Sequence, residues 1–135
     1  MFQPNQREKM KAIRKLHELG QSLWVDHATH KFLESDLLKD CIKDRSLTGL
    51  VSNPAATVHT INNSTAYDGV IRKQLKRNII GEELYFEIEM ERLRRAADLF
   101  RPIYEQTDGF DGWVSLAVSP LISHDSDRTL AAVRE

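Results

Sequence analysis

The sequence predicts an α/β fold in which the strands of a small parallel sheet alternate with helices. Three short apolar stretches indicate the strands, because each closes on small polar or acidic residues: Ser22–Asp26, Leu47–Pro54 and Gly112–Pro120. Helical patterns fill the intervals between them, and strands that alternate with helices favour parallel pairing. Functional groups of such sheets gather at the carboxyl ends of the strands. We therefore expect the functional site at that edge.

Length and composition are those of one globular domain. The chain has 135 residues, of which 41% are hydrophobic and 29% charged, so we expect residues 1–135 to form a single domain. The net charge is -1 and both signs are spread along the chain, which argues against nucleic acid as a partner. No apolar run has membrane length and the start lacks a signal pattern, so a cytoplasmic protein without a membrane partner is expected.

Helices are predicted on both sides of the first strand. Apolar residues recur with helical spacing between Met10 and Leu19, and Gly20 stops the pattern. A second helical stretch runs over Thr29–Lys43, either as one helix or as two, because Ser35 can cap a fresh turn midway. These helices are expected to pack on the sheet.

Three more helices are predicted between the second and third strands. Proline suits the first helical turn, so Pro54–Ile61 reads as a short helix. Ser64 is expected to cap the next helix, which reaches about Asn78. The longest helix is expected over Glu82–Phe100, and Pro102 should end or kink it.

The polar side chains at the strand ends are the candidate site residues. Asp26 closes the first strand, and Asn53 closes the second, where it also stands before a proline as a good helix N-cap. His27 and His30 form an H-x-x-H pair, which without further ligands is weak evidence for zinc, so no metal site is expected. One cysteine, Cys41, allows no intrachain disulfide.

Two other patterns are interpreted as structural. Trp24 and Trp113 lie in predicted strands and are expected in the core. The alternating Glu and Arg residues of positions 82–95 are interpreted as a solvated helix surface with pairs four residues apart. The last predicted helix begins after a capping Ser126 and reaches the final residue, so we expect the chain to stop within an unfinished unit.

With these elements placed, the chain resembles the amino-terminal part of the transaldolase family. The stretches that carry the resemblance occur in matching order and spacing: LGQSLWVD (Leu19–Asp26), GLVSNP (Gly49–Pro54), AADLFRPIY (Ala96–Tyr104) and VSLAVSP (Val114–Pro120). The resemblance implies the fold class of an incomplete (β/α)₈ TIM barrel, with about three parallel strands and surrounding helices. Residues 1–135 would be its amino-terminal portion.

The resemblance also implies a reaction. Members of the family transfer a dihydroxyacetone unit between sugar phosphates in the pentose phosphate pathway, through a Schiff base on a strand-end lysine. They use no metal and no organic cofactor. The chemistry needs the imine because a protonated imine accepts the electrons of the broken carbon–carbon bond better than a carbonyl does. Carboxylates then move the protons.

Two of the family's site residues have counterparts in this sequence. Asp26 matches the first-strand acid that exchanges a proton with a substrate hydroxyl, and Asn53 matches the second-strand amide that binds the substrate. The third-strand glutamate falls at Ala117 and is absent. The Schiff-base lysine belongs to a fourth strand, whereas the lysines of this chain all lie in predicted helices: Lys9, Lys11, Lys15, Lys31, Lys39, Lys43, Lys73 and Lys76.

Three interpretations follow, and the sequence leaves them open. In the first, the chain is a transaldolase fragment that is inactive alone because it lacks the lysine and the glutamate. In the second, it is a non-catalytic interaction protein that reuses a half-barrel, and in the third a decayed reading frame. Three strands cannot close a barrel, so open sheet edges favour self-association or a complementary fragment as partner. Whether the chain is itself an enzyme is not decided.

Overall fold

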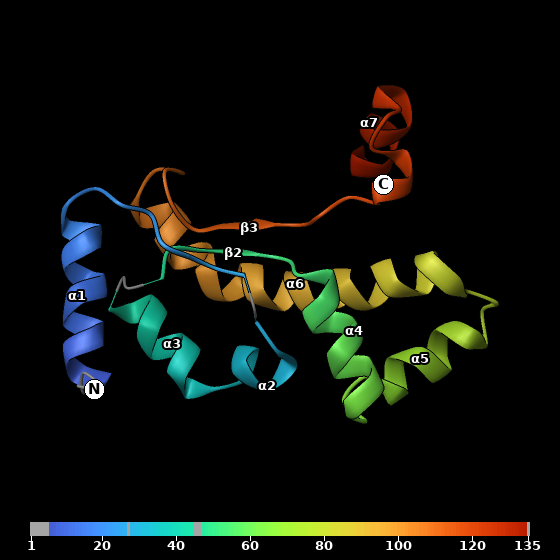
Figure 1. The fold of residues 1–135 in the computed structure, drawn as a ribbon, viewed down its shortest axis with the longest axis horizontal. Coiled ribbons are helices and arrows are strands. Elements are labelled where there is room, and N and C mark those ends of the chain that lie inside the picture. Colours follow the sequence, from blue (N-terminus) through green and yellow to red (C-terminus); the bar gives the residue numbers. More distant parts are fainter. Residues whose placement is uncertain (1–5, 27, 45–46, 135) are drawn as a thin grey trace, which may run out of the picture.

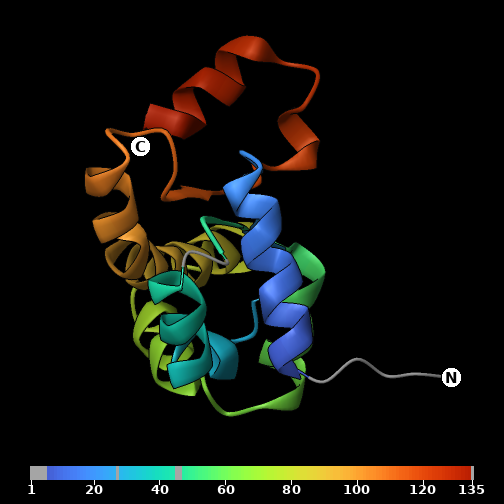
Figure 2. The same cartoon turned by 90° about the vertical axis from the view of Figure 1, so that its left-hand side faces the viewer.

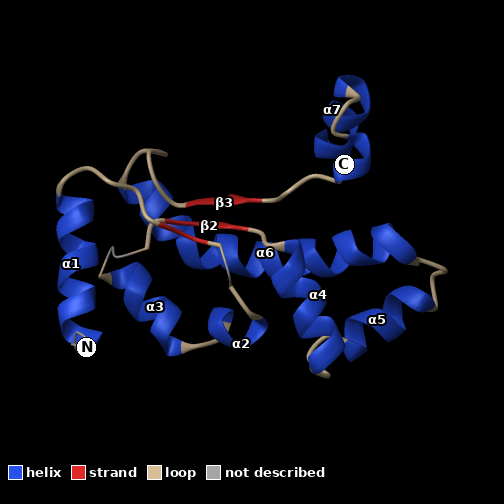
Figure 3. Cartoon of the chain, in the orientation of Figure 1, coloured by secondary structure: helices blue, strands red, loops and turns tan. Residues whose placement is uncertain are grey.

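The predicted parallel sheet is confirmed. The protein is described by a computed structural model that covers residues 6–26, 28–44 and 47–134. Its strands are β1 (Trp24–Val25), β2 (Gly49–Val51) and β3 (Trp113–Ser115), and they pair in parallel in the order β1-β2-β3 (Figures 1 and 3). The strands are shorter than predicted, although single backbone hydrogen bonds continue the pairing past their ends, as from the Thr48 N–H to the Leu23 carbonyl at 2.8 Å.

Helices precede the sheet and follow each of its strands. In chain order they are α1 (Gln6–Glu18), α2 (His30–Leu33), α3 (Asp36–Lys43), α4 (Pro54–Asn63), α5 (Asp68–Leu75), α6 (Gly81–Gln106), the 3₁₀ helix η1 (Pro120–Ile122) and α7 (Ser126–Arg134). Helix α6 runs along the sheet, and α1 stands beside the ends at which the strands begin (Figure 1). In both Figures 1 and 2, α7 stands apart from α2–α6. Within the described residues, none of the helices combines the length and apolar character needed to cross a bilayer.

The two faces of the sheet differ in what covers them. Register places Val25 beside Leu50 and Leu50 beside Val114, and this face packs on the helices, so we call it the covered face. Leu50 is fully buried there. The core behind it is drawn mainly from α3 and α6 and contains Leu33, Leu38, Ile42, Leu93, Ala96, Phe100 and Ile103.

The opposite face, here called the open face, carries the tryptophans. Register aligns Trp24 with Gly49 and Gly49 with Trp113. Trp24 is 43% exposed and Trp113 49% exposed, so the expectation that both lie in the core is wrong. The reason is the alternation of side chains along a strand, which turns both rings away from the only face that α6 covers. Strand residues enter a core only on a covered face.

Local helix signals were partly right. Ser35 begins α3 as predicted, since its hydroxyl oxygen accepts from the Leu38 N–H at 3.4 Å, and the 29–43 stretch is therefore two helices. Ser64 does not cap α5; its hydroxyl donates to the carbonyl of Thr60 at 2.9 Å, at the end of α4. That bond within the preceding helix competes with capping of the next one.

Proline does not end the longest helix. α6 continues through Pro102 to Gln106. The ring removes one helical hydrogen bond, but Phe100 and Ile103 on either side are buried in the core, and this packing holds the turn. The final helix also begins differently from the prediction, because Asp125 rather than Ser126 accepts the Arg128 N–H, at 2.9 Å.

Gly49 fits beneath a tryptophan ring, and replacing it tests the arrangement of the open face. A Cβ at Gly49 would lie 2.5 Å from Cε2 of Trp24. We expect Gly49→Ala to lower the free energy of unfolding by about 1–3 kcal/mol, the usual cost of overpacking, measured by urea denaturation. The control is Gly69→Ala in α5, where nothing lies within 4 Å of the new methyl group. It should raise stability by about 0.5–1 kcal/mol. Equal effects of the two substitutions would contradict the packing of Trp24 over Gly49.

Candidate functional site

The sequence-predicted site positions fall on the open face at the carboxyl ends of the strands. Side chains alternate between the two faces of a strand. By this alternation, Asp26 continues the face of Trp24 past β1. In the same way, Asn53 continues the face of Gly49 and Val51 past β2, and Ala117 continues that of Trp113 past β3. The register of β2 with β3, continued past Val51 and Ser115, sets Asn53 beside Ala117. An acid, an amide and a methyl group therefore occupy neighbouring strand ends.

Asn53 is held by the helix that it begins. Its side-chain Oδ1 accepts from the N–H groups of Ala55 at 3.1 Å and Ala56 at 3.3 Å, so the N-cap alternative is confirmed. This fixes the side chain and leaves Nδ2 without a partner among the described residues. Asp26 is exposed and accepts no hydrogen bond from the described chain. An amide fixed through its oxygen thus follows the strand next to the one that the exposed Asp26 follows.

The third strand end contributes backbone rather than a charged group. The Ala117 N–H donates to the hydroxyl of Ser52 at 2.7 Å, and the Ser52 N–H donates to the Ser115 carbonyl at 2.8 Å. These bonds extend the pairing of β2 and β3 beyond the ladder. They hold Asn53 and Ala117 at the same level of the sheet.

No lysine within the described residues lies at a strand end. Lys9 belongs to α1, and every other lysine has an exposed side chain on a helix or a helix cap: Lys11, Lys15, Lys31, Lys39, Lys43, Lys73 and Lys76. Likewise, the parts of the chain that the structure covers contain no group of three or more His, Cys, Asp or Glu side chains that could hold a metal ion. His27 lies outside the described residues, and His30 faces Glu34 at 3.4 Å.

A buried ion pair behind the strand ends was missed from the sequence. Glu89 and Arg92 of α6 have side chains that are 0% and 3% exposed, and Arg92 Nη2 lies 2.5 Å from Glu89 Oε1. The expectation of a solvated charged surface over positions 82–95 is wrong at these two residues. A signal was available, because positions 89 and 92 each lie four residues before a core residue, Leu93 and Ala96, on the same helical stripe.

The buried pair affects neighbouring tyrosines. Burial, and next the negative charge of Glu89, raise the pKa of Tyr85 to about 12. Burial also raises the pKa of Tyr67, which the positive charge of Arg92 partly opposes. Both phenols are therefore neutral throughout the physiological range.

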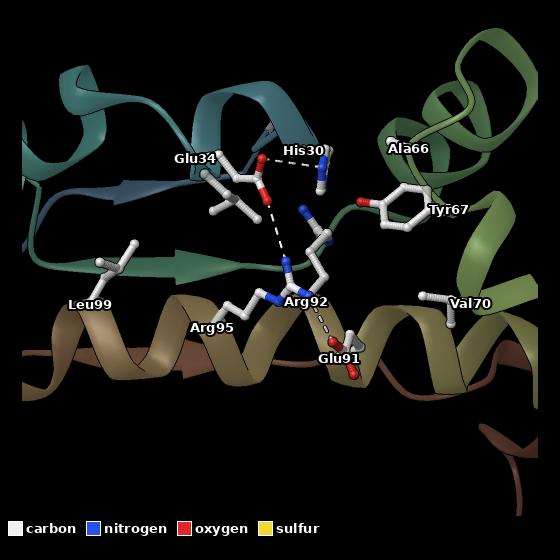
Figure 4. Close-up of a pocket in the computed structure, with 10 residues that line it drawn as sticks. His30, Glu34, Ala66, Tyr67, Val70, Glu91, Arg92, Arg95 and Leu99 are labelled. Carbon is white, nitrogen blue, oxygen red and sulfur yellow. Dashed lines mark hydrogen bonds and ion pairs between the residues drawn. The ribbon is translucent and has the colours of Figure 1, made fainter. Parts of the chain in front are cut away.

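A small pocket lies in the helical layer, between α2, α5 and α6 (Figure 4). The charged groups at its rim are paired with one another: Glu34 lies 3.3 Å from Arg95, and Arg95 lies 2.9 Å from Glu91. Tyr67 and His30 form its other wall, with ring centroids 5.2 Å apart. Leu33 and Leu99, which line this pocket, also pack in the core behind the covered face, so the pocket and the strand-end residues belong to opposite sides of the sheet.

Parallel strands in sequential order, with helices after each strand and polar groups at the carboxyl ends, define part of an α/β TIM barrel. The model of the transaldolase/fructose-6-phosphate aldolase family matches residues 23–135. The chain therefore belongs to this family. The match begins immediately before β1 and includes all three strand ends.

Individual relatives agree with the family match. Over 122 residues the chain is 37% identical to a transaldolase of Thermobifida fusca, covering 90% of this chain and 33% of that protein. It is 32% identical over 122 residues to transaldolase 2 of Nostoc punctiforme, covering 90% and 32%. A transaldolase of Trichodesmium erythraeum is 34% identical over 119 residues, covering 88% and 31%. The chain thus spans about a third of the length of these relatives.

The capping role of Asn53 can be separated from any role toward a ligand. We expect Asn53→Ala to lower the free energy of unfolding by about 0.5–2 kcal/mol, because two N–H groups of α4 lose their acceptor. Asn53→Asp should retain nearly full stability, since a carboxylate accepts the same bonds and suits a helix start. Asp26→Asn is the control and should leave thermal unfolding unchanged. A stable Asn53→Ala variant would show that the cap is not formed.

Proposed function

We propose that this chain is the amino-terminal part of a transaldolase-type barrel, with residues 1–135 as one domain that works in the cytoplasm. Family membership and the placement of Asp26 and Asn53 on one face support the proposal. The substrates would be sugar phosphates, and the reaction transfer of a dihydroxyacetone unit. The observation that carries the proposal is that an acid and an amide follow two adjacent parallel strands.

Within that reaction the two residues have different parts. Asp26 is exposed, which suits a carboxylate that exchanges a proton with a substrate hydroxyl. Asn53 is fixed through Oδ1, so its Nδ2 can donate a hydrogen bond in a constant direction. A pre-oriented donor loses little freedom when it binds a hydroxyl or carbonyl.

The chain alone is proposed to be inactive. A Schiff base needs a nucleophilic amine, and lysine is activated by desolvation or by a neighbouring cation. The exposed helical lysines of the described chain have no such setting. Ala117 offers no carboxyl group where the family glutamate would act. The missing amine would have to come from a complementary segment that pairs with an open edge of the sheet.

A second candidate function is that of a non-catalytic interaction protein. Exposed apolar side chains favour it: besides the two tryptophans of the open face, Leu130 and Val133 of α7 are 50% and 66% exposed. Such surfaces are covered by partners or by copies of the same chain. In this case Ala117 would be tolerated because no proton transfer is needed.

Reductive trapping tests the proposal. We expect incubation with fructose 6-phosphate and borohydride to leave the intact mass of the chain unchanged, because the lysines whose side chains the structure describes are exposed on helices and not activated to form an imine. The full-length Thermobifida fusca relative, treated in parallel, is the positive control and should gain the mass of a reduced sugar adduct. An adduct on the isolated chain would overturn the proposed inactivity.

The same experiment separates the two candidate functions. The part of the Thermobifida fusca protein that follows the aligned region is added to the chain before trapping. Under the fragment proposal, an adduct appears on the added segment only when the chain is present and is reduced by Asp26→Asn. Under the interaction proposal, the two polypeptides yield no adduct.

A further inference from the structure

One buried ion pair is hydrogen-bonded to both chain segments that carry the candidate site residues. Arg92 Nη1 donates to the carbonyl of Ala28, which lies two residues after Asp26. Glu89 Oε2 accepts from the Thr57 hydroxyl at 2.8 Å, and the Thr57 N–H donates to the Asn53 carbonyl at 3.1 Å. The connection after β1 and the first turn of α4 are therefore joined through two side chains of α6.

The hydrogen bonds of Glu89 and Arg92 fix the orientation of both side chains. Glu89 accepts from Arg92 Nε at 3.1 Å and from Nη2 at 2.5 Å, in addition to Thr57. Burying two charges is expensive, and apolar side chains of similar size often serve stability as well or better. Stability alone therefore does not account for the pair. What apolar side chains would not supply is directional bonding to two separate strand connections.

The third strand end is joined to the same helix. Ser119, two residues after Ala117, donates its hydroxyl to Glu82 Oε1 at 2.5 Å. Glu82 lies two turns before Glu89 on α6, so side chains of one helix reach the connections after all three strands. Glu82 is exposed, whereas Glu89 and Arg92 are buried.

We propose that Glu89 and Arg92 are positioning residues that set Asp26 and Asn53 relative to one another across the open face. Arg92 acts on the β1 side through Ala28, and Glu89 acts on the β2 side through Thr57. The inference rests on the proposed function for what Asp26 and Asn53 do, but the positioning itself is a property of the chain without substrate.

The experiment uses the full chain and nuclear magnetic resonance without a ligand. Thr57→Val keeps the shape of the side chain and removes only the donor to Glu89. We expect it to shift the side-chain amide signals of Asn53, and Thr57→Ser, which restores the hydroxyl, to return them to their original positions. Arg92→Lys loses the fork that reaches both Glu89 and Ala28, and we expect it to shift the carboxyl signal of Asp26.

A matched control is present on the same helix. Asp98 and Arg101 have the spacing of the buried pair, i and i+3, with 2.9 Å between Asp98 Oδ1 and Arg101 Nη2, but both are exposed. Arg101→Lys should move neither the Asn53 nor the Asp26 signals. The indole signal of Trp113, at the opposite end of the sheet, should stay in place in every variant and excludes a general loss of structure.

Each result decides the inference. Unchanged Asn53 signals in Thr57→Val, or shifts that Thr57→Ser does not reverse, would overturn it. If Thr57→Val does not fold, Arg92→Lys carries the test, and an unmoved Asp26 signal would overturn the inference in the same way. Adding fructose 6-phosphate to the original chain keeps the two proposals distinguishable. Absence of any response at Asn53 counts against its substrate role and leaves the positioning result as measured.

Discussion

The packing of α6 on one face of three very short strands is the interaction on which the rest of the structure depends. Strands of two or three residues are not stable by themselves, and they persist here because Leu50 shares one buried core cluster with Ala96 and Phe100 of α6. All three of these side chains are fully buried. The long helix therefore supports the strands, whose own pairing sets the register and with it the positions of the strand-end residues.

The same arrangement explains why the other face is open. The helical layer lies on one side of the sheet, so the side chains that alternate away from it meet solvent, and the candidate site residues are among them. In a closed barrel that face would be the interior. The exposed tryptophans belong to the face that would point into the interior of a closed barrel of this family.

Short-range sequence signals predicted most of the helices and strands. The burial of individual side chains was decided by contacts between residues far apart in sequence. Ser35 and Asn53 could be placed as helix caps because a cap depends only on residues within one turn. The burial of Trp24 could not be judged from its strand, since the strand does not say which face a helix covers. The role of Glu89 depended on Ala28 and Thr57, far away in sequence, so an alternating charge pattern suggested a solvated surface instead.

Exposure of the open face is the central claim, and quenching of tryptophan fluorescence by acrylamide tests it most directly. The chain has only two tryptophans, and both lie on that face, so the signal reports on nothing else. The account predicts that acrylamide quenches both half-exposed indoles in dilute chain that sediments as a monomer, and that a covering segment protects them. Strong protection in the monomer would contradict it.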